Sequence, residues 1–224
     1  MGILNQLPAA WRYLLENQAE FLSLLSTHLQ LVVVAVVCAI LVAVPAGVLA
    51  TRRPKLKGYI LGMGNVAQSV PTIAIIFLVF PVLGIGFTTA LVGLFTYALL
   101  PILTNTIAGI EDVDESTVEA ARGMGMTDWE ILKQIQLPLA LPVIFAGIRT
   151  ASVITVGTAY LAFFIGGGGL GLWVVVGIKL FNMPQVLAGA IPGALLAIGM
   201  DSLFALVEHR LGGEGLQNAS AAGA

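Results

Sequence analysis

Five apolar stretches, each long enough to cross a bilayer, constrain this chain more than any other feature of its sequence. A crossing helix needs about 20 predominantly apolar residues. The five stretches are 22–50 (with 29 as a later possible start), 58–80, 86–110, 138–165 and 184–207. A sixth apolar run, 170–181, is too short to cross and contains Lys179, so we expect a re-entrant or surface segment. The pattern predicts an all-α, polytopic membrane protein with about five transmembrane helices and a transmembrane domain over 22–210.

The composition supports this class without reference to any family. Hydrophobic residues make up 58% of the chain and charged residues 10%, against roughly 25% charged in soluble domains. A net charge of −2 argues against a nucleic-acid partner, which requires a basic surface. The single cysteine, Cys38, lies in an apolar stretch, and His28 and His209 are far apart in sequence. We therefore expect no disulfide, no metal site and no cofactor, and we expect both histidines at the membrane interface.

The two ends of the chain differ from the spans. In 1–21, Pro8 can begin a helix whose apolar face includes Trp11 and Leu14, with Arg12 and Glu16 toward water. We expect this segment to lie in the membrane interface. The last residues, 211–224, are rich in Gly, Ala, Ser and Asn, and we expect a disordered tail there.

Residues 111–137 form the long polar segment between apolar spans, which places it in water at the membrane surface. The spacing predicts a helix over 113–124, ended by Gly125 in the left-handed conformation. Thr127 and Glu130 then match a capping box that opens a second short helix. That helix would gather Trp129, Leu132 and Ile135 on one face, and Pro138 would begin the next span. Two short helices joined by small residues make a compact knob suited to a groove on a partner.

This segment resembles the EAA loop of ABC-importer permeases, whose pattern is Glu-Ala-Ala, three residues, Gly, nine residues, Ile-x-Leu-Pro. Every position of the pattern is filled here, by Glu119, Ala120, Ala121, Gly125, Ile135, Leu137 and Pro138. The resemblance implies that the loop is the coupling helix that fits a groove on the ATP-hydrolysing subunit. The alternative is an ordinary cytoplasmic loop containing a helical hairpin.

The basic residues predict the orientation, because cytoplasmic loops carry an excess of Lys and Arg. With the EAA-like loop inside, Arg12 and Lys179 lie outside, and seven basic residues lie inside: Arg52, Arg53, Lys55, Lys57, Arg122, Lys133 and Arg210. The amino terminus is then outside and the carboxyl terminus inside. Charge and motif agree on the topology.

Polar residues and prolines within the spans need protein neighbours or a wet cavity, because hydrocarbon cannot satisfy them. Asn65, Gln68, Ser69 and Thr72 share one helical face next to Pro71, and the third span adds Tyr97 and Asn105. One interpretation is a translocation pathway between two permease subunits, lined by Gln68, Ser69, Pro71, Tyr97 and Asn105. The other is a set of inter-helix hydrogen bonds in a packed bundle.

Two ionisable residues fall within the spans. Arg149 lies on the order of 16 Å above Pro138 and Asp201 about 12 Å above His209, so a structural ion pair is expected. The rival interpretation has Arg149 reaching the cytoplasmic interface or the coupling loop. The glycine-rich run 166–171 is not a phosphate loop, because no Gly-Lys-Ser/Thr follows it, and we expect a turn or hinge on the outer face.

The resemblance to importer permeases extends over most of residues 25–210. The stretches Gln68–Ala74, Leu99–Thr106, Ala146–Ala151 and Phe164–Gly171 are similar to permeases of osmoprotectant importers, which carry glycine betaine, carnitine or choline. This similarity implies the type I importer permease fold in a bacterial inner membrane and a role without catalysis. The implied partners are a separate ATP-binding subunit, an extracytoplasmic solute-binding protein and a second permease subunit. Alternatives are a permease for methionine or another small solute, and a channel or assembly subunit.

Overall fold

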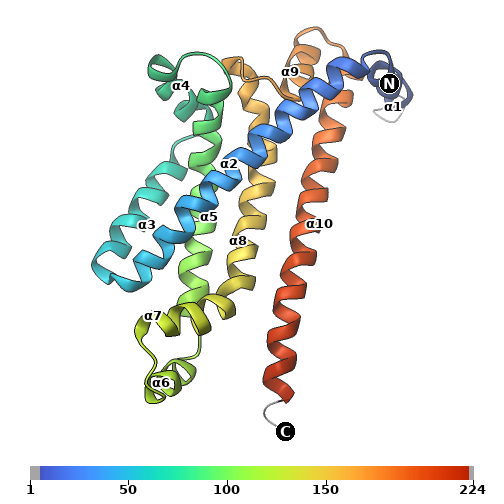
Figure 1. Ribbon diagram of the computed structural model, residues 1–224. Coiled ribbons are helices and arrows are strands. Elements are labelled where there is room, and N and C mark those ends of the chain that lie inside the picture. The colour runs from blue at the N-terminus through green and yellow to red at the C-terminus, as the bar shows by residue number, and fades with distance from the viewer. Residues whose placement is uncertain (1–5, 222–224) are drawn as a thin grey trace.

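A computed structural model of the chain describes residues 6–221, and every regular element in that range is helical (Figure 1). Four helices are long and apolar enough to span a membrane, and the number is five if one bent pair is counted as a single span. The long helices are α2 (Gln18–Arg52), α5 (Phe87–Glu111), α8 (Leu137–Thr158) and α10 (Met183–Ala221). The shorter α-helices are α1 (Leu7–Glu16), α3 (Pro54–Ser69), α4 (Thr72–Leu83), α6 (Glu115–Gly123), α7 (Asp128–Ile131) and α9 (Gly171–Lys179). The predicted all-α, five-span class is confirmed.

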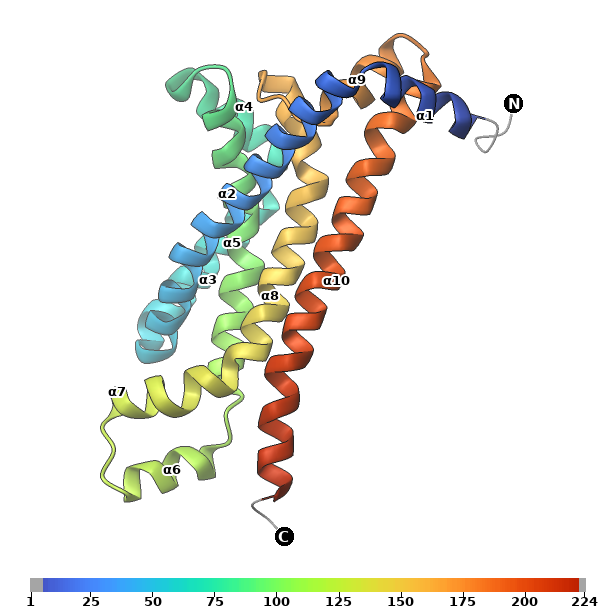
Figure 2. The same cartoon turned by 45° about the vertical axis from the view of Figure 1, so that its right-hand side comes forward.

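The short helices gather at the two ends of the bundle (Figures 1 and 2). At one end lie α1, α4 and α9, and at the other lie α6 and α7, with α2 crossing the bundle obliquely between them. The nine residues of α9 are too few to cross a membrane, as predicted for the sixth apolar run. The helix α1 has Pro8 in its first turn and packs against α10, and its Tyr13 ring meets Trp173 of α9 edge-on at 5.2 Å. Its position in the membrane interface stays a prediction.

The second span differs from the continuous helix expected over 58–80. It consists of α3 and α4, which meet at an angle of 96°. Pro71 has no N–H and its ring excludes the residue before it from helical geometry, so Val70 is extended, with φ −83° and ψ 128°. The polar face expected over 65–72 is therefore split, and Thr72 is buried on α4 instead of continuing the α3 face.

The fifth span, Met183–Glu208, agrees with the expected 184–207, but the helices that contain the fourth and fifth spans are longer than the spans. Helical structure runs unbroken over Asp128–Ile165, 38 residues, so the helix of the fourth span begins inside the polar loop and not at Pro138. It passes through a π-helical turn, Leu132–Gln136, and ends in a 3₁₀ turn, Ala159–Ile165. The helix α10 continues through Ala221, where disorder was expected from 211 on. The helix-favouring Ala, Leu, Gln and Glu of that segment accompany its glycines, and residues 222–224 lie outside the described range.

Small residues bring the three central helices close together. The buried face of α2 presents Ala35, Ala39 and Ala43 to the core, and Gly47 faces Thr106 of α5. Between α5 and α8, a Cβ added at Gly147 would lie 2.6 Å from the Cβ of Asn105. Close backbone approach of this kind is how helices associate in a membrane, where no hydrophobic force drives them together.

The sequence led us to expect His28 at the membrane interface, and the structure places its side chain inside the bundle, against α8 and the glycine run. It is fully buried, with Nε2 3.1 Å from the carbonyl oxygen of Val156 and its ring edge-on to Tyr160. The glycine run folds back over it: Gly169 has φ +83°, and a Cβ there would lie 3.1 Å from Nδ1 of His28. The α2 helix begins earlier than expected and turns this position toward α8. The side chain of His209 lies outside the described residues.

Gly147→Ala should destabilise the bundle, because the added methyl group would also lie 2.7 Å from the carbonyl oxygen of Pro101 and force α5 and α8 apart. Overpacking of this kind costs about 1–3 kcal/mol. Gly157→Ala is the matched control on the same helix, since no atom lies within 4 Å of its added Cβ. Thermal unfolding in detergent should give a lower midpoint for Gly147→Ala only. Equal midpoints for the two variants would show that this contact does not limit packing.

Candidate functional site

The polar loop begins with a well-capped helix. Asp114 caps α6, and its Oδ1 accepts the backbone N–H of Ser116 at 2.7 Å. Hydrogen bonds from Ser116 hold the pKa of the Asp114 carboxyl below its ordinary value. The helix ends at Gly123, close to the predicted boundary, and Gly125 has φ +86°, the left-handed conformation predicted for it. Its N–H donates to the carbonyl of Arg122 at 2.9 Å, and so the chain reverses toward α7.

The predicted capping box is present at the start of α7. The N–H of Thr127 donates to Oε2 of Glu130 at 2.8 Å, and the hydroxyl of Thr127 donates to the same oxygen at 2.7 Å. In return, the N–H of Glu130 donates to Oγ1 of Thr127 at 3.4 Å. These bonds lower the pKa of the Glu130 carboxyl, the side-chain bond from Thr127 contributing most.

A π-helical turn joins α7 to α8. The N–H of Leu137 reaches back five residues to the carbonyl of Leu132, and Pro138 follows within the first turn of α8. A proline in a regular α-helix clashes with the carbonyl four residues before it. The wider turn relieves that clash and lets the helix continue. Ile135 and Leu137 are half-buried there, and Pro138 is exposed.

The knob consists of α6, α7 and the turn between them. Helical spacing predicted that Trp129, Leu132 and Ile135 share one face, but their exposure differs. Trp129 is 67% exposed, whereas Leu132 and its neighbour Ile131 are each 1% exposed. Glu119 and Ala120 are exposed, and Ala121 is fully buried at the joint, where its carbonyl accepts the N–H of Met126. Met124, at 75% exposure, extends the outer surface of the knob. The knob therefore presents several charged side chains, small residues and two large apolar side chains.

Arg52 ties the knob to the bundle, and two ion pairs lie beside it. In the sequence, the basic members of these contacts stood out only as part of the charge bias. Nη2 of Arg52, at the end of α2, donates to Oε1 of Gln136 at 2.7 Å and to the carbonyl of Asp128 at 3.2 Å. Lys57 pairs with Glu111 at 2.6 Å, joining α3 to α5. Arg122 of α6 lies 3.5 Å from Asp128 of α7.

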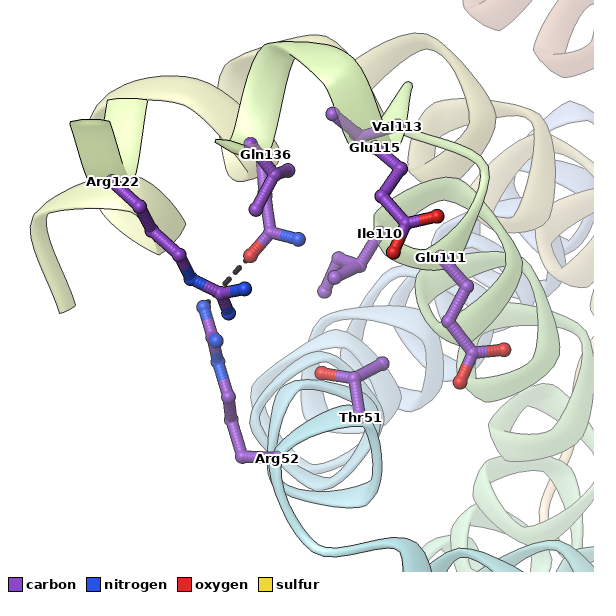
Figure 3. Close-up of a pocket in the computed structure, with 9 residues that line it drawn as sticks. Thr51, Arg52, Ile110, Glu111, Val113, Glu115, Arg122 and Gln136 are labelled. Atoms are coloured by element: carbon purple, nitrogen blue, oxygen red, sulfur yellow. Dashed lines mark hydrogen bonds between the residues drawn. The ribbon is translucent and has the colours of Figure 1, made fainter. Parts of the chain in front are cut away.

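A cavity of about 310 Å³ lies between the knob and the ends of α2 and α5. In Figure 3, Arg52 and Arg122 point toward each other on one side of it, while Glu111 and Glu115 line the other. The space between knob and bundle is therefore polar and incompletely filled. A knob held by a few directed hydrogen bonds beside such a space can shift more readily than one packed by apolar side chains.

The five residues considered for a pathway do not converge on one cavity in the described chain. Tyr97 of α5 donates to the carbonyl of Val70 at 2.9 Å, beside Pro71 and Ser69 at the break in the second span. Ser69 is exposed and Gln68 is half-buried. Asn105 lies two turns further along α5, faces Gly147 of α8 and donates to the carbonyl of Pro101 at 2.8 Å. Tyr97 and Asn105 thus make bonds within the bundle, while Ser69 faces away from it.

Arg149 and Asp201 are brought together. Nε and Nη2 of Arg149 donate to the two carboxylate oxygens of Asp201 at 2.6 and 2.9 Å, and Glu208 lies 3.5 Å from Nη1. The paired fork geometry joins α8 to α10 within the spans. The rival interpretation required Arg149 to reach the cytoplasmic interface or the polar loop. Its side chain instead pairs with α10.

The fold and the loop define the membrane component of a solute importer. A family model described as binding-protein-dependent transport system inner membrane component matches residues 39–213, and the chain belongs to that family. It is a multi-pass inner-membrane permease of an ABC transporter, a transport component that is not itself catalytic. Family membership favours this function over the channel or assembly-subunit alternative.

The chain is similar to two permeases of Bacillus subtilis. The glycine betaine/carnitine/choline transport system permease protein OpuCB is 42% identical, over 92% of this chain and 94% of the relative. The choline transport system permease protein OpuBB is also 42% identical, over 92% and 95%. Among solved structures, the MetNI methionine ABC transporter in an inward-facing conformation aligns with a TM-score of 0.80 and 21% identity, over 88% of this chain and 98% of that chain. That likeness establishes the type I importer permease fold.

The capping box should depend on pH with a definite sign. Because the pKa of Glu130 is lowered in the folded loop, its ionised form stabilises the loop above the ordinary carboxyl pKa, and this contribution disappears as the pH falls through the lowered value. Amide hydrogen exchange over 128–131 should be slower in the wild type than in Glu130→Gln at neutral pH. The difference between the two proteins should vanish in acid. A difference that persists in acid would mean that the carboxylate is not the stabilising group.

Proposed function

We propose that this permease is driven by ATP hydrolysis on a separate cytoplasmic subunit and that the knob is the element through which it is driven. The supporting observation is the unbroken helix from Asp128 to Ile165, which starts in the exposed knob and ends on the far side of the bundle. A displacement applied at Trp129 is therefore passed to α8 without a flexible joint. Glu119, Ala120, Ala121, Gly125, Ile135, Leu137 and Pro138 carry this coupling role.

The mechanism that follows is alternating access. Closure of two ATPase subunits on ATP carries two knobs inward as rigid bodies, and the spans attached to them open the pathway on the opposite side. The bond from Arg52 to Gln136 makes α2 follow the knob as well. The amino terminus is outside and the carboxyl terminus inside, in keeping with the basic α2–α3 turn at the same end as the knob.

The pathway lies between two permease subunits, identical or related, along the second and third spans. Gln68, Ser69, Pro71, Tyr97 and Asn105 are its candidate residues. In support, α3 has no buried residue in the described chain and exposes Ser69 and Asn65 within a span. Polar groups at such a depth require protein or water on their open side. The Arg149–Asp201 pair has a structural role, holding α10 against α8.

The carried solute is a quaternary ammonium osmoprotectant such as glycine betaine, carnitine or choline, delivered by an extracytoplasmic binding protein. The full-length similarity to permeases named for these solutes supports this assignment. Recognition of such a cation uses a cage of aromatic rings. Because no such cage is formed by the described residues, the binding protein supplies the selectivity. A permease for methionine is the second candidate, on fold likeness alone.

Glu119→Lys and Gly125→Pro should each abolish most ATP-dependent uptake while leaving the protein inserted. Lysine reverses the one exposed charge of the motif, and proline cannot adopt the φ of +86° found at Gly125. Gly123→Ala is the control, because its added Cβ meets nothing within 4 Å and its φ is ordinary. Uptake and co-purification of the ATPase are measured together. Unchanged uptake in both variants would refute the coupling role of the knob.

The solute class can be tested by ATPase activity in lipid vesicles that contain the permease and its companion ATPase. Addition of a betaine-type binding protein with glycine betaine should raise turnover, and a methionine-type binding protein with methionine should not. Stimulation by the methionine pair alone would refute the osmoprotectant assignment and leave the importer intact. Failure to recover any ATPase with the permease would refute the coupling proposal itself.

A further inference from the structure

The turn between α2 and α3 concentrates positive charge at the knob end of the bundle. Four of its six residues, Arg52 to Lys57, are cationic. Two of the four are engaged, Arg52 with Gln136 and Lys57 with Glu111. Arg53 and Lys55 are exposed, and neither has a carboxylate within 4 Å among the described side chains. Their charge is therefore available to a ligand.

These two cations border a hollow with room for a polar group. The hollow, of about 500 Å³, is lined by Arg52, Arg53, Pro54, Lys55 and Leu56. Pro54 opens the 16-residue α3, so the hollow also lies at the amino-terminal end of a helix. The helix dipole at such an end favours a negative group. Cations and helix end both select an anion.

A second, apolar groove adjoins the basic hollow. It has a volume of about 390 Å³ and runs between the last turns of α2 and the start of α7. Its apolar lining is Pro45, Val48, Leu49, Trp129 and Leu132, and Arg52 and Asp128 lie at its polar edge. Arg52 lines both spaces and so marks their common edge. Leu49 and Trp129 are 44% and 67% exposed, so the groove opens outward. An anionic site and an apolar site lie side by side.

We propose that an anionic phospholipid binds here, with its phosphate at Arg53 and Lys55 and one acyl chain in the groove against Trp129. A soluble anion would fill only the basic hollow, and an acidic protein segment would leave the apolar groove empty. A phospholipid matches both parts, at the level where a membrane-surface tryptophan is expected. Such a lipid joins the α2–α3 turn to the knob. The proposal requires only that the chain spans a bilayer, so it stands whether or not the knob couples to an ATPase.

Fluorescence of Trp129 provides the test. Trp11→Phe removes the other exposed tryptophan, and Trp173, fully buried at the opposite end, serves as an internal reference. The full-length variant is placed in phosphatidylcholine vesicles to which phosphatidylglycerol brominated on its acyl chains is added in steps. Because each nearby cation favours an anionic lipid by roughly fivefold, half-maximal quenching should need far less brominated phosphatidylglycerol than brominated phosphatidylcholine.

Two double variants separate this site from general charge attraction. Arg53→Gln with Lys55→Gln should make the two brominated lipids quench alike. Arg12→Gln with Lys179→Gln removes two exposed cations at the α1/α9 end and should leave the preference unchanged. Equal quenching in the parent protein, or a preference that survives the first double variant, would overturn the proposal.

Two further outcomes would also overturn it by pointing to another ligand. Reversal of the quenching by soluble glycerol phosphate would assign the hollow to a small anion. Loss of ATPase co-purification in the Arg53/Lys55 variant, with lipid preference intact, would assign the surface to a protein partner.

Discussion

Every backbone carbonyl and amide inside a bilayer needs a partner from the protein, and this requirement governs the second span. Pro71 removes a donor and breaks the helix, which frees the carbonyl of Val70. The hydroxyl of Tyr97 on α5 satisfies that carbonyl at 2.9 Å. This long-range hydrogen bond supports the 96° bend, and the bend places α4 at the α1/α9 end of the bundle.

Local signals in the sequence were sufficient for the knob. Gly125 and the Thr127–Glu130 box depend only on residues within a few positions of each other, and both have the predicted geometry. The approximate positions of the spans also follow from apolar length. What the sequence could not supply depended on partners distant in the chain: the angle at Pro71 depends on α5, and the burial of His28 depends on α8 and the glycine run. Helical spacing likewise cannot indicate which side chains a neighbouring helix will cover.

The membrane-spanning part of the bundle and its knob end are held together by different kinds of contact. Through the membrane, α2, α5 and α8 meet by small residues such as Gly47 and Gly147, which fix the helices at short range and leave no room for adjustment. At the knob end, contacts are made by long charged side chains beside a cavity of about 310 Å³. Close packing keeps the transmembrane helices rigid, and the polar contacts at the knob end can rearrange when the knob moves.

The early end of α3 also affects the surrounding bilayer. Its 16 residues extend about 24 Å, whereas the hydrocarbon core of a typical bilayer is about 30 Å thick. On that flank the lipid must thin by several ångströms, or water must descend to the level of the Val70 carbonyl. A permanent dimple beside the second span would make this protein sensitive to membrane thickness, and longer acyl chains would oppose the bent state with an elastic force.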